Sequence, residues 1–280
     1  MIVDIHTHIF PEKIAAAVLA GAEKNLGLPS FAPGTLEGLK DKMDESGTDL
    51  SIVLGVAPEP KYVRSINDWL LKIRDDRVQF FGGIHPNMDG WEDELKRLKD
   101  HGVCGLKLNS LLQNIRPDDP RMYKIYEKAA RHFVMLFHAG GSIKQKDHPG
   151  EIQATPQRIA KVLDDFPEMT VIAAHFGGNQ VLDQMKVHLL GREVYLDTSY
   201  PPNLAELSAD EVVSIIRAHG ADRVLFGTDF PWETPSRCLE YLRNLKLSEE
   251  ERQKILGGNA RKLLFGKSTH NPPSPFAGED

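Results

Sequence analysis

The chain has 280 residues, of which 41% are hydrophobic and 26% are charged, and this is the ordinary composition of a globular protein. Such a length suits one large α/β domain or two small ones. The formal net charge of −6 gives no support to a nucleic-acid partner or to binding at an anionic membrane surface. We therefore expect a small-molecule substrate as the main partner, and a homo-oligomer is compatible with the sequence.

The cysteine content and the hydropathy of the sequence indicate the cellular compartment of the protein. The two cysteines, Cys104 and Cys238, lie far apart, which argues against a disulfide framework and fits a reducing cytosol. No run reaches the roughly 18–20 consecutive apolar residues of a membrane-spanning helix. The strand that carries the first candidate metal ligands begins at residue 2, so cleavage of a leader peptide would remove the site. These features predict a cytoplasmic protein.

Eight short apolar runs that are typical of buried strands follow one another along the chain. They cover residues 2–5, 50–56, 78–84, 103–108, 133–138, 170–174, 194–196 and 223–226. Amphipathic segments with helical spacing lie between them, at residues 36–43, 91–100, 121–131, 156–165, 204–218 and 238–245. This alternation predicts parallel strands covered by helices, and eight such units predict an α/β fold of the (β/α)8 TIM-barrel type. The alternative is an open doubly wound sheet, but no Gly-x-Gly-x-x-Gly motif follows the first strand.

Two segments fall outside this alternation. The link between the first two strands, residues 9–35, is the longest and is rich in Gly, Ala and Pro, which indicates a lid or pocket loop. The last stretch of the chain contains three prolines and few apolar residues. We expect the barrel domain to occupy residues 1–265 and residues 266–280 to form a disordered tail.

The first strand ends in the run Ile2-Val3-Asp4-Ile5-His6-Thr7-His8. Side chains two positions apart on a strand share a face, so the imidazoles of His6 and His8 should leave the strand end in the same direction. Two neutral imidazoles that converge in this way make half of a metal site. His-x-His alone is weak, because surface and core histidines are common, so the interpretation depends on the rest of the chain.

Other strand-like runs also end in metal-binding or charged side chains. In a (β/α)8 barrel the active site lies at the carboxyl ends of the strands. The residues at these ends are His85, Lys107, His138, His175 and Asp229, on strands three, four, five, six and eight. Histidines together with a carboxylate bind a divalent transition metal and leave positions open for water and substrate. His138, His175 or Asp229 alone could be a core histidine or a helix cap, but their arrival together with His6 and His8 predicts a metal site.

Seven short motifs run through the chain in order. They are Asp4-Ile5-His6-Thr7-His8, Gly105-Leu106-Lys107-Leu108, Phe137-His138, Ala174-His175-Phe176-Gly177-Gly178, Tyr195-Leu196-Asp197-Thr198-Ser199, Phe226-Gly227-Thr228-Asp229-Phe230-Pro231 and Gly258-Asn259-Ala260-Arg261-Lys262-Leu263. Together they resemble the amidohydrolase superfamily and, within it, the amidohydrolase-2 (amidohydrolase-related) branch. The resemblance implies that the ligands of a catalytic metal, usually zinc, are His6, His8, His138 and Asp229. It also implies that His175 either binds a second metal or polarises the water or the substrate.

Lys107 decides how many metal ions are expected. In some superfamily members a lysine at this strand end is carbamylated and bridges two metals. An unmodified lysine facing a barrel mouth instead binds an anion, such as a substrate carboxylate. We favour the anion-binding role, and hence one ion, with two ions if Lys107 is carbamylated. Asn109-Ser110 follows where many relatives have His-Pro, so no role of that loop is carried over.

Three further side chains have two interpretations each. His85 either lines the pocket and contacts substrate or hydrogen-bonds a backbone carbonyl. Arg116, in the loop after the fourth strand, either meets an anionic substrate or is a solvated surface charge. Asp197, near the end of the seventh strand, is expected to orient a ligand histidine rather than to bind the metal.

The candidate site supports three functional hypotheses, of which the first is a metal-dependent hydrolase of a small carboxylate-bearing amide, ester or lactone. Its metal would lower the pKa of bound water from about 15.7 toward about 7. Asp229 would take the water's proton, and His175 would stabilise the oxyanion. The second hypothesis is a metal-dependent, non-oxidative decarboxylase of a small aromatic or unsaturated acid, with the proton supplied by Asp229 or through a water linked to His175. The third is a non-catalytic metal-binding scaffold.

Overall fold

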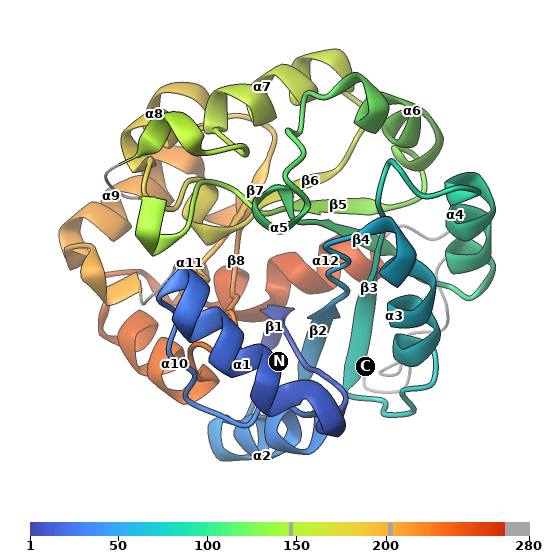
Figure 1. The fold of residues 1–280 in the computed structure, drawn as a ribbon. Helices are drawn as coiled ribbons and strands as arrows, with labels where there is room; N and C mark the ends of the chain where they lie inside the picture. Colours follow the sequence, from blue (N-terminus) through green and yellow to red (C-terminus); the bar gives the residue numbers. More distant parts are fainter. Residues whose placement is uncertain (146–147, 201–203, 267–280) are drawn as a thin grey trace.

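The computed structural model describes residues 1–145, 148–200 and 204–266, and it shows eight parallel strands surrounded by helices (Figure 1). The strands are β1 Val3–Thr7, β2 Leu50–Leu54, β3 Val78–Gly83, β4 Gly105–Leu108, β5 Val134–Phe137, β6 Val171–Ala173, β7 Tyr195–Asp197 and β8 Val224–Leu225. Each strand pairs in parallel with the next, in the order β1 to β8. This order confirms the predicted (β/α)8 TIM barrel. Apart from Gly266, the predicted disordered tail lies outside the described residues.

Helices follow most strands and cover the outside of the barrel. They are α1 Glu12–Leu26, α2 Leu36–Ser46, α3 Val63–Leu70, α4 Trp91–Asp100, α5 Ser110–Gln113, α6 Pro120–Ala129, α7 Pro156–Asp165, α8 Leu182–His188, α9 Ala209–His219, α10 Pro235–Asn244, α11 Glu249–Gln253 and α12 Asn259–Phe265. A π-helical turn, Lys254–Gly258, joins α11 to α12. Among the described residues, no helix has the length and apolar content needed to cross a membrane.

Helix α1 lies within the segment that was expected to be a lid loop. The prediction of a loop is wrong for residues 12–26, which are rich in alanine, the strongest helix former. The helix ends at Gly27, whose φ of 74° is the left-handed conformation that terminates many helices. The Gly and Pro residues that indicated a loop come after it. Within that later part, the Phe31 N–H donates to the carbonyl of Pro231 at 2.8 Å, so it packs against the loop after β8.

The barrel interior is filled by side chains from strands on opposite sides of the sheet. Val3, Leu50, Leu136 and Leu225 belong to one buried cluster, and strands so far apart in the sheet order meet inside the barrel. Two side chains of α12 complete this cluster. A side chain at Gly257, just before α12, would collide with the carbonyl of Met1, so this part of the chain packs under the start of β1. Apolar packing therefore closes the amino end of the barrel, and polar groups gather at the carboxyl end.

Strand β1 carries one extra residue between Asp4 and Thr7. Asp4 lies opposite Ser51 of β2, so regular pairing would put Thr7 opposite Leu54, yet Thr7 lies opposite Val53. A bulge of this kind bends a strand and re-aims its side chains, and bulges are common beside active sites. The irregularity falls at the first predicted metal ligand, His6.

The seam between β8 and β1 is held by separate hydrogen bonds rather than by a continuous ladder. Strand β8 is only two residues long, and the chain beyond it continues the contact with β1. The Asp229 N–H donates to the carbonyl of His6 at 2.9 Å, and the His8 N–H donates to the carbonyl of Phe230 at 2.6 Å. The barrel therefore closes through residues that are, or adjoin, the predicted metal ligands.

Candidate metal centre

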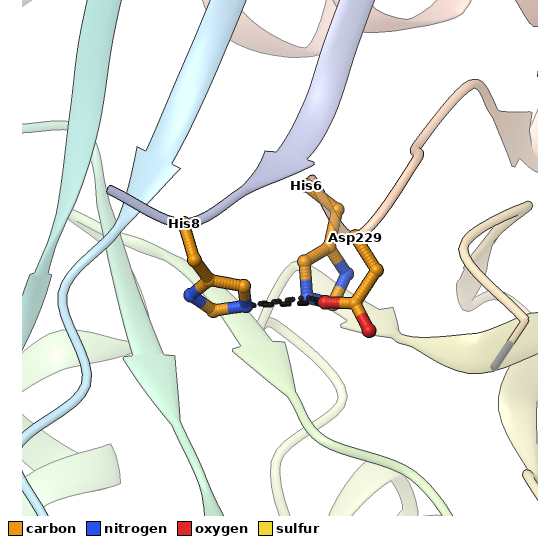
Figure 2. Close-up of side chains that lie close together, drawn as sticks. All are labelled: His6, His8 and Asp229. Atoms are coloured by element: carbon orange, nitrogen blue, oxygen red, sulfur yellow. Dashed lines mark hydrogen bonds and ion pairs between the residues drawn. The ribbon is translucent and has the colours of Figure 1, made fainter. Parts of the chain in front are cut away.

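Three predicted ligands converge at the carboxyl end of the barrel, where Figure 2 shows their side chains pointing toward one another. The Nε2 atoms of His6 and His8 are 3.2 Å apart. Each of them is 3.3 Å from Oδ1 of Asp229. Metal–nitrogen bonds of about 2.1 Å at tetrahedral angles put ligand atoms about 3.4 Å apart, so these spacings fit one divalent ion. All three residues are buried.

The hydrogen bond between His6 and Asp197 directs the lone pair of the other ring nitrogen, Nε2, into the centre. Its Nδ1 is 2.9 Å from Oδ2 of Asp197, at the end of β7. A carboxylate accepts hydrogen bonds, so Nδ1 carries the proton and Nε2 presents its lone pair to His8 and Asp229. Burial, and then the charge of Lys107, lower the pKa of His6 well below its ordinary value, which keeps the ring neutral. Asp197 is thus placed where the expected orienting role requires it.

Asp197 also holds the start of the turn after β6. Its Oδ1 accepts hydrogen bonds from the backbone N–H of His175 at 3.0 Å and of Ser199 at 3.1 Å. One buried carboxylate therefore connects His6 on β1 with His175 beyond β6. Ser199 adds a second link, because its Oγ is 2.9 Å from Nδ1 of His6.

His138 and His175 form a pair beside the three-residue group. Nδ1 of His138 is 2.9 Å from Nε2 of His175, and Nδ1 of His175 is 2.5 Å from the carbonyl of Ser199. The carbonyl fixes the proton of His175 on Nδ1, so His138 donates to His175. Nε2 of His138 is then a buried lone pair that has no hydrogen-bond partner among the described residues. The structure thus gives His138 a free ligand atom, but it does not include His138 in the group of mutually close atoms.

Two of these residues have a strained backbone conformation. Asp229 has a φ of 63° and His175 a φ of 57°, both in the left-handed region that residues other than glycine rarely adopt. Burial alone would raise the pKa of Asp229, but His6, His8 and His175 outweigh it and hold the pKa well below its usual range. Asp229 is therefore an ionised carboxylate, the form that binds a metal.

Lys107 reaches the same centre from β4. Its side chain is buried, and its Nζ is 3.4 Å from Nε2 of His6. Burial lowers the pKa of Lys107 to about 8, against the opposing effect of Asp229 and Asp197. This amine faces the ligand group from β4.

The other two predicted substrate-binding residues are not among the three mutually close ligand residues. His85, after β3, is buried, and its Nδ1 accepts a hydrogen bond from the Asn87 N–H at 3.2 Å. The side chain of Arg116 is 49% exposed and lies 3.9 Å from Asp118, as a surface ion pair does. The structure therefore matches the surface interpretation of Arg116 better than a role in substrate binding.

The whole barrel can be compared with known proteins. A family model described as "Amidohydrolase", of the amidohydrolase-2 branch, matches residues 3–266. The chain belongs to the amidohydrolase family. The predicted family is therefore confirmed, and the match covers every residue of the candidate centre.

Individual amidohydrolases similar to the chain include one curated protein and two solved structures. The chain is 24% identical over 118 residues to the gamma-resorcylate decarboxylase of Polaromonas sp. strain JS666, a stretch that covers 37% of this chain and 36% of that protein. It is 15% identical to the 5-carboxyvanillate decarboxylase of Sphingomonas paucimobilis, with a TM-score of 0.72, 94% of this chain covered and 98% of the other. It is 20% identical to a dihydroxybenzoic acid decarboxylase of Polaromonas sp. JS666 with bound manganese and the inhibitor 2-nitroresorcinol, with a TM-score of 0.67, 94% of this chain covered and 96% of the other.

The prediction of a hydrolase is wrong, because all three proteins in these comparisons are named as decarboxylases. Histidine and carboxylate ligands indicate a metal site, but they do not by themselves determine which reaction the metal serves. The comparisons support an enzyme rather than a metal-binding scaffold. They also support a divalent metal, but the expected zinc gains no support, since the metal in the Polaromonas structure is manganese.

Two residues beside the candidate centre are not among the site residues that the sequence predicts. The ring of Trp232 lies 5.2 Å from that of His8, and its indole Nε1 is buried without a hydrogen-bond partner among the described residues. Asp4 is buried on β1 and bonded to Thr228, beside Asp229. Asp4 could have been found from its place in the His-x-His motif, since an acidic residue inside a strand is unusual. Nothing in the sequence marked Trp232.

Proposed function

We propose that this chain is a metal-dependent, non-oxidative decarboxylase of a small aromatic acid that carries a hydroxyl group beside the carboxylate. The observation that carries the proposal is the group of three ligand atoms, 3.2–3.3 Å apart, at the mouth of the barrel. Support also comes from the similarity of that barrel, over 94% of this chain, to decarboxylases of hydroxylated benzoic acids.

The residues that would hold the metal are His6, His8 and Asp229, with the free Nε2 of His138 as the fourth ligand atom. A divalent ion bound there would hold and polarise the oxygen atoms of the substrate. Manganese is the first ion to test because of the Polaromonas structure, and zinc is the second because histidines dominate the ligand set.

Two side chains of this chain would orient the acid. The ammonium group of Lys107 would pair with an anionic oxygen of the substrate, because its Nζ faces the ligand group from β4. The indole of Trp232 would cover the side of the site next to His8 and offer its unpartnered N–H to a substrate oxygen. His85 and Arg116 are left out of this arrangement.

The reaction replaces the carboxylate of an aromatic carbon by a proton. The ring carbon takes a proton, the bond to the carboxylate breaks, its electron pair returns to the ring, and carbon dioxide leaves. We propose that Asp229, which is ionised at rest, takes a proton from the substrate hydroxyl group or from water and passes it to the ring carbon, with His175 beside the ligands as the second acid–base group. A dry, buried site favours loss of the charged carboxylate, and the residues around the centre are buried.

A substrate panel tests the proposal directly. Metal-stripped protein is loaded with manganese or zinc and given 2,6-dihydroxybenzoate, 5-carboxyvanillate and benzoate, with carbon dioxide release and ring absorbance as readouts. Turnover of a hydroxylated acid, and none of benzoate, is expected. The variant His8→Ala is the control, because it should lose both metal and turnover. Metal-loaded wild type that binds its ion but decarboxylates none of these acids would overturn the proposed function.

A further inference from the structure

Asp4 is a buried carboxylate at the barrel seam whose contacts are all with uncharged donors. Its Oδ2 accepts a hydrogen bond from the hydroxyl of Thr228 at 2.6 Å. Its Oδ1 accepts from the backbone N–H of Thr228 at 3.1 Å and of His6 at 3.2 Å. No ion pair within the described part of the chain involves Asp4. Burying a carboxylate without a cation is costly, so a residue of this kind at this place calls for a reason.

These hydrogen bonds join the two segments that carry the metal ligands. One oxygen of Asp4 holds the backbone of His6 on β1 and the backbone of Thr228, which precedes Asp229. The hydroxyl of Thr228 in turn accepts a hydrogen bond from the N–H of Phe230, which follows Asp229, at 3.0 Å. Asp229, with its left-handed φ of 63°, is thus bracketed on both sides by one hydrogen-bonded unit.

The seam gives these contacts their importance. Elsewhere in the barrel, neighbouring strands are paired in regular ladders, but between β8 and β1 the structure records an isolated bridge at Thr7 and Phe230 and a few separate backbone hydrogen bonds. His6 and His8 come from one side of this seam and Asp229 from the other. A small shift along the seam would change the 3.3 Å distances between Asp229 and the two imidazoles.

We propose that Asp4 and Thr228 form a seam clamp that sets the spacing between the histidine ligands and Asp229, and so determines how tightly the metal is held. Neither residue contacts the metal or the substrate, and both act as positioning residues. This inference rests on the proposed metal site. A merely structural pair would affect the stability of the barrel, whereas the clamp affects metal affinity beyond any change in stability.

The test compares isosteric variants of both partners in the full-length, metal-stripped protein. Thr228→Val removes the hydroxyl and keeps the shape, Thr228→Ser keeps the hydroxyl, and Asp4→Asn removes the charge. Manganese or zinc is titrated in competition with a chromogenic chelator, and thermal unfolding of each metal-free variant is measured beside it. Thr228→Val and Asp4→Asn should weaken metal binding by about 10–100-fold, the scale of losses from groups that orient metal ligands. Thr228→Ser should stay close to wild type.

Thr7→Val is the matched control. Thr7 is also a buried threonine of the same region, and its hydroxyl donates to the carbonyl of Ile52 at 2.9 Å, on the β2 side of β1. This variant should lose stability like Thr228→Val but keep the metal affinity of wild type. The double variant of Asp4 and Thr228 should bind metal no more weakly than the worse single variant, because both substitutions break one unit.

The outcomes separate the clamp from the metal site itself. Wild type that binds neither metal overturns the metal site on which the clamp depends. Wild type that binds metal, with Thr228→Val equal to Thr7→Val in affinity, overturns the clamp and leaves the metal site standing. If Asp4→Asn does not fold, the comparison of Thr228→Val with Thr228→Ser decides, since these differ at the hydroxyl.

Discussion

Replacing Asp197 by asparagine should weaken metal binding although Asp197 is not expected to touch the metal. In the structure, Oδ1 of Asp197 accepts hydrogen bonds from two backbone N–H groups, of His175 and Ser199. The amide oxygen of the asparagine would keep these contacts, so its NH2 group would take the place of Oδ2, 2.9 Å from Nδ1 of His6. The NH2 group of the asparagine and the N–H of His6 Nδ1 would then face each other as two hydrogen-bond donors.

His6 can relieve this conflict by moving its proton from Nδ1 to Nε2. The protonated Nε2 would no longer offer a lone pair to the metal. Loss of a group that orients a metal-bound histidine typically costs 10- to 100-fold in metal affinity, which corresponds to about 1.4–2.7 kcal/mol. We therefore expect a weakening of this size for Asp197→Asn, measured by chelator competition in the metal-stripped protein.

The control for this prediction is Glu94→Gln, which also neutralises a buried carboxylate. Glu94 lies on α4 and binds Asn67 and Arg97, away from the site. Its substitution should lower the melting temperature and leave the metal affinity unchanged. If Asp197→Asn binds metal as tightly as Glu94→Gln and wild type, the hydrogen bond to Asp197 does not set the proton position on His6.

Three further predictions concern other residues of the barrel. His219 is fully buried, accepts a hydrogen bond from the Gly191 N–H at 3.1 Å and donates to the Val194 carbonyl at 2.8 Å, and burial lowers its pKa. In the unfolded state His219 is protonated near pH 6.5, whereas in the folded state its protonation is disfavoured. The free energy of unfolding should therefore fall as the pH drops below about 6.5, by at most about 1.4 kcal/mol per pH unit. His219→Gln should lose less stability than wild type over that range in denaturant titrations, and an equal loss would refute the assignment. Gly140 has a φ of 87°, and a Cβ there would collide with the backbone of Asn179, so Gly140→Ala should cost about 2 kcal/mol or more in unfolding free energy, with Gly150→Ala, which meets no atom within 4 Å, as the control. His175→Asn should lower kcat by about 10²–10⁴-fold while elemental analysis shows wild-type metal content, and a loss of metal in step with activity would instead make His175 a ligand.

The sequence predicts the strand order and the convergence of His6, His8 and Asp229, because strand–helix alternation and strand-end positions have simple geometric consequences. It does not predict the extra residue in β1, since a bulge depends on pairing with β2 and not on local composition. It does not predict the helix at residues 12–26, because Gly and Pro follow directly after the alanine-rich segment and indicate a loop. The sequence also does not predict which ligand atoms lie close enough to share one ion, or that His138 faces His175. Both depend on side-chain packing across several strands.

The seam between β8 and β1 also bears on how the chain is made. During synthesis, strands β1 to β7 emerge before β8, and until then the sheet has two free edges. An uncovered edge of apolar strands is a template for pairing with another chain. The last part of the described chain both supplies Asp229 and, through α12, packs against the start of the barrel. Premature termination after β7 should therefore yield a product that lacks Asp229 and α12, leaves both edges of the sheet uncovered and aggregates.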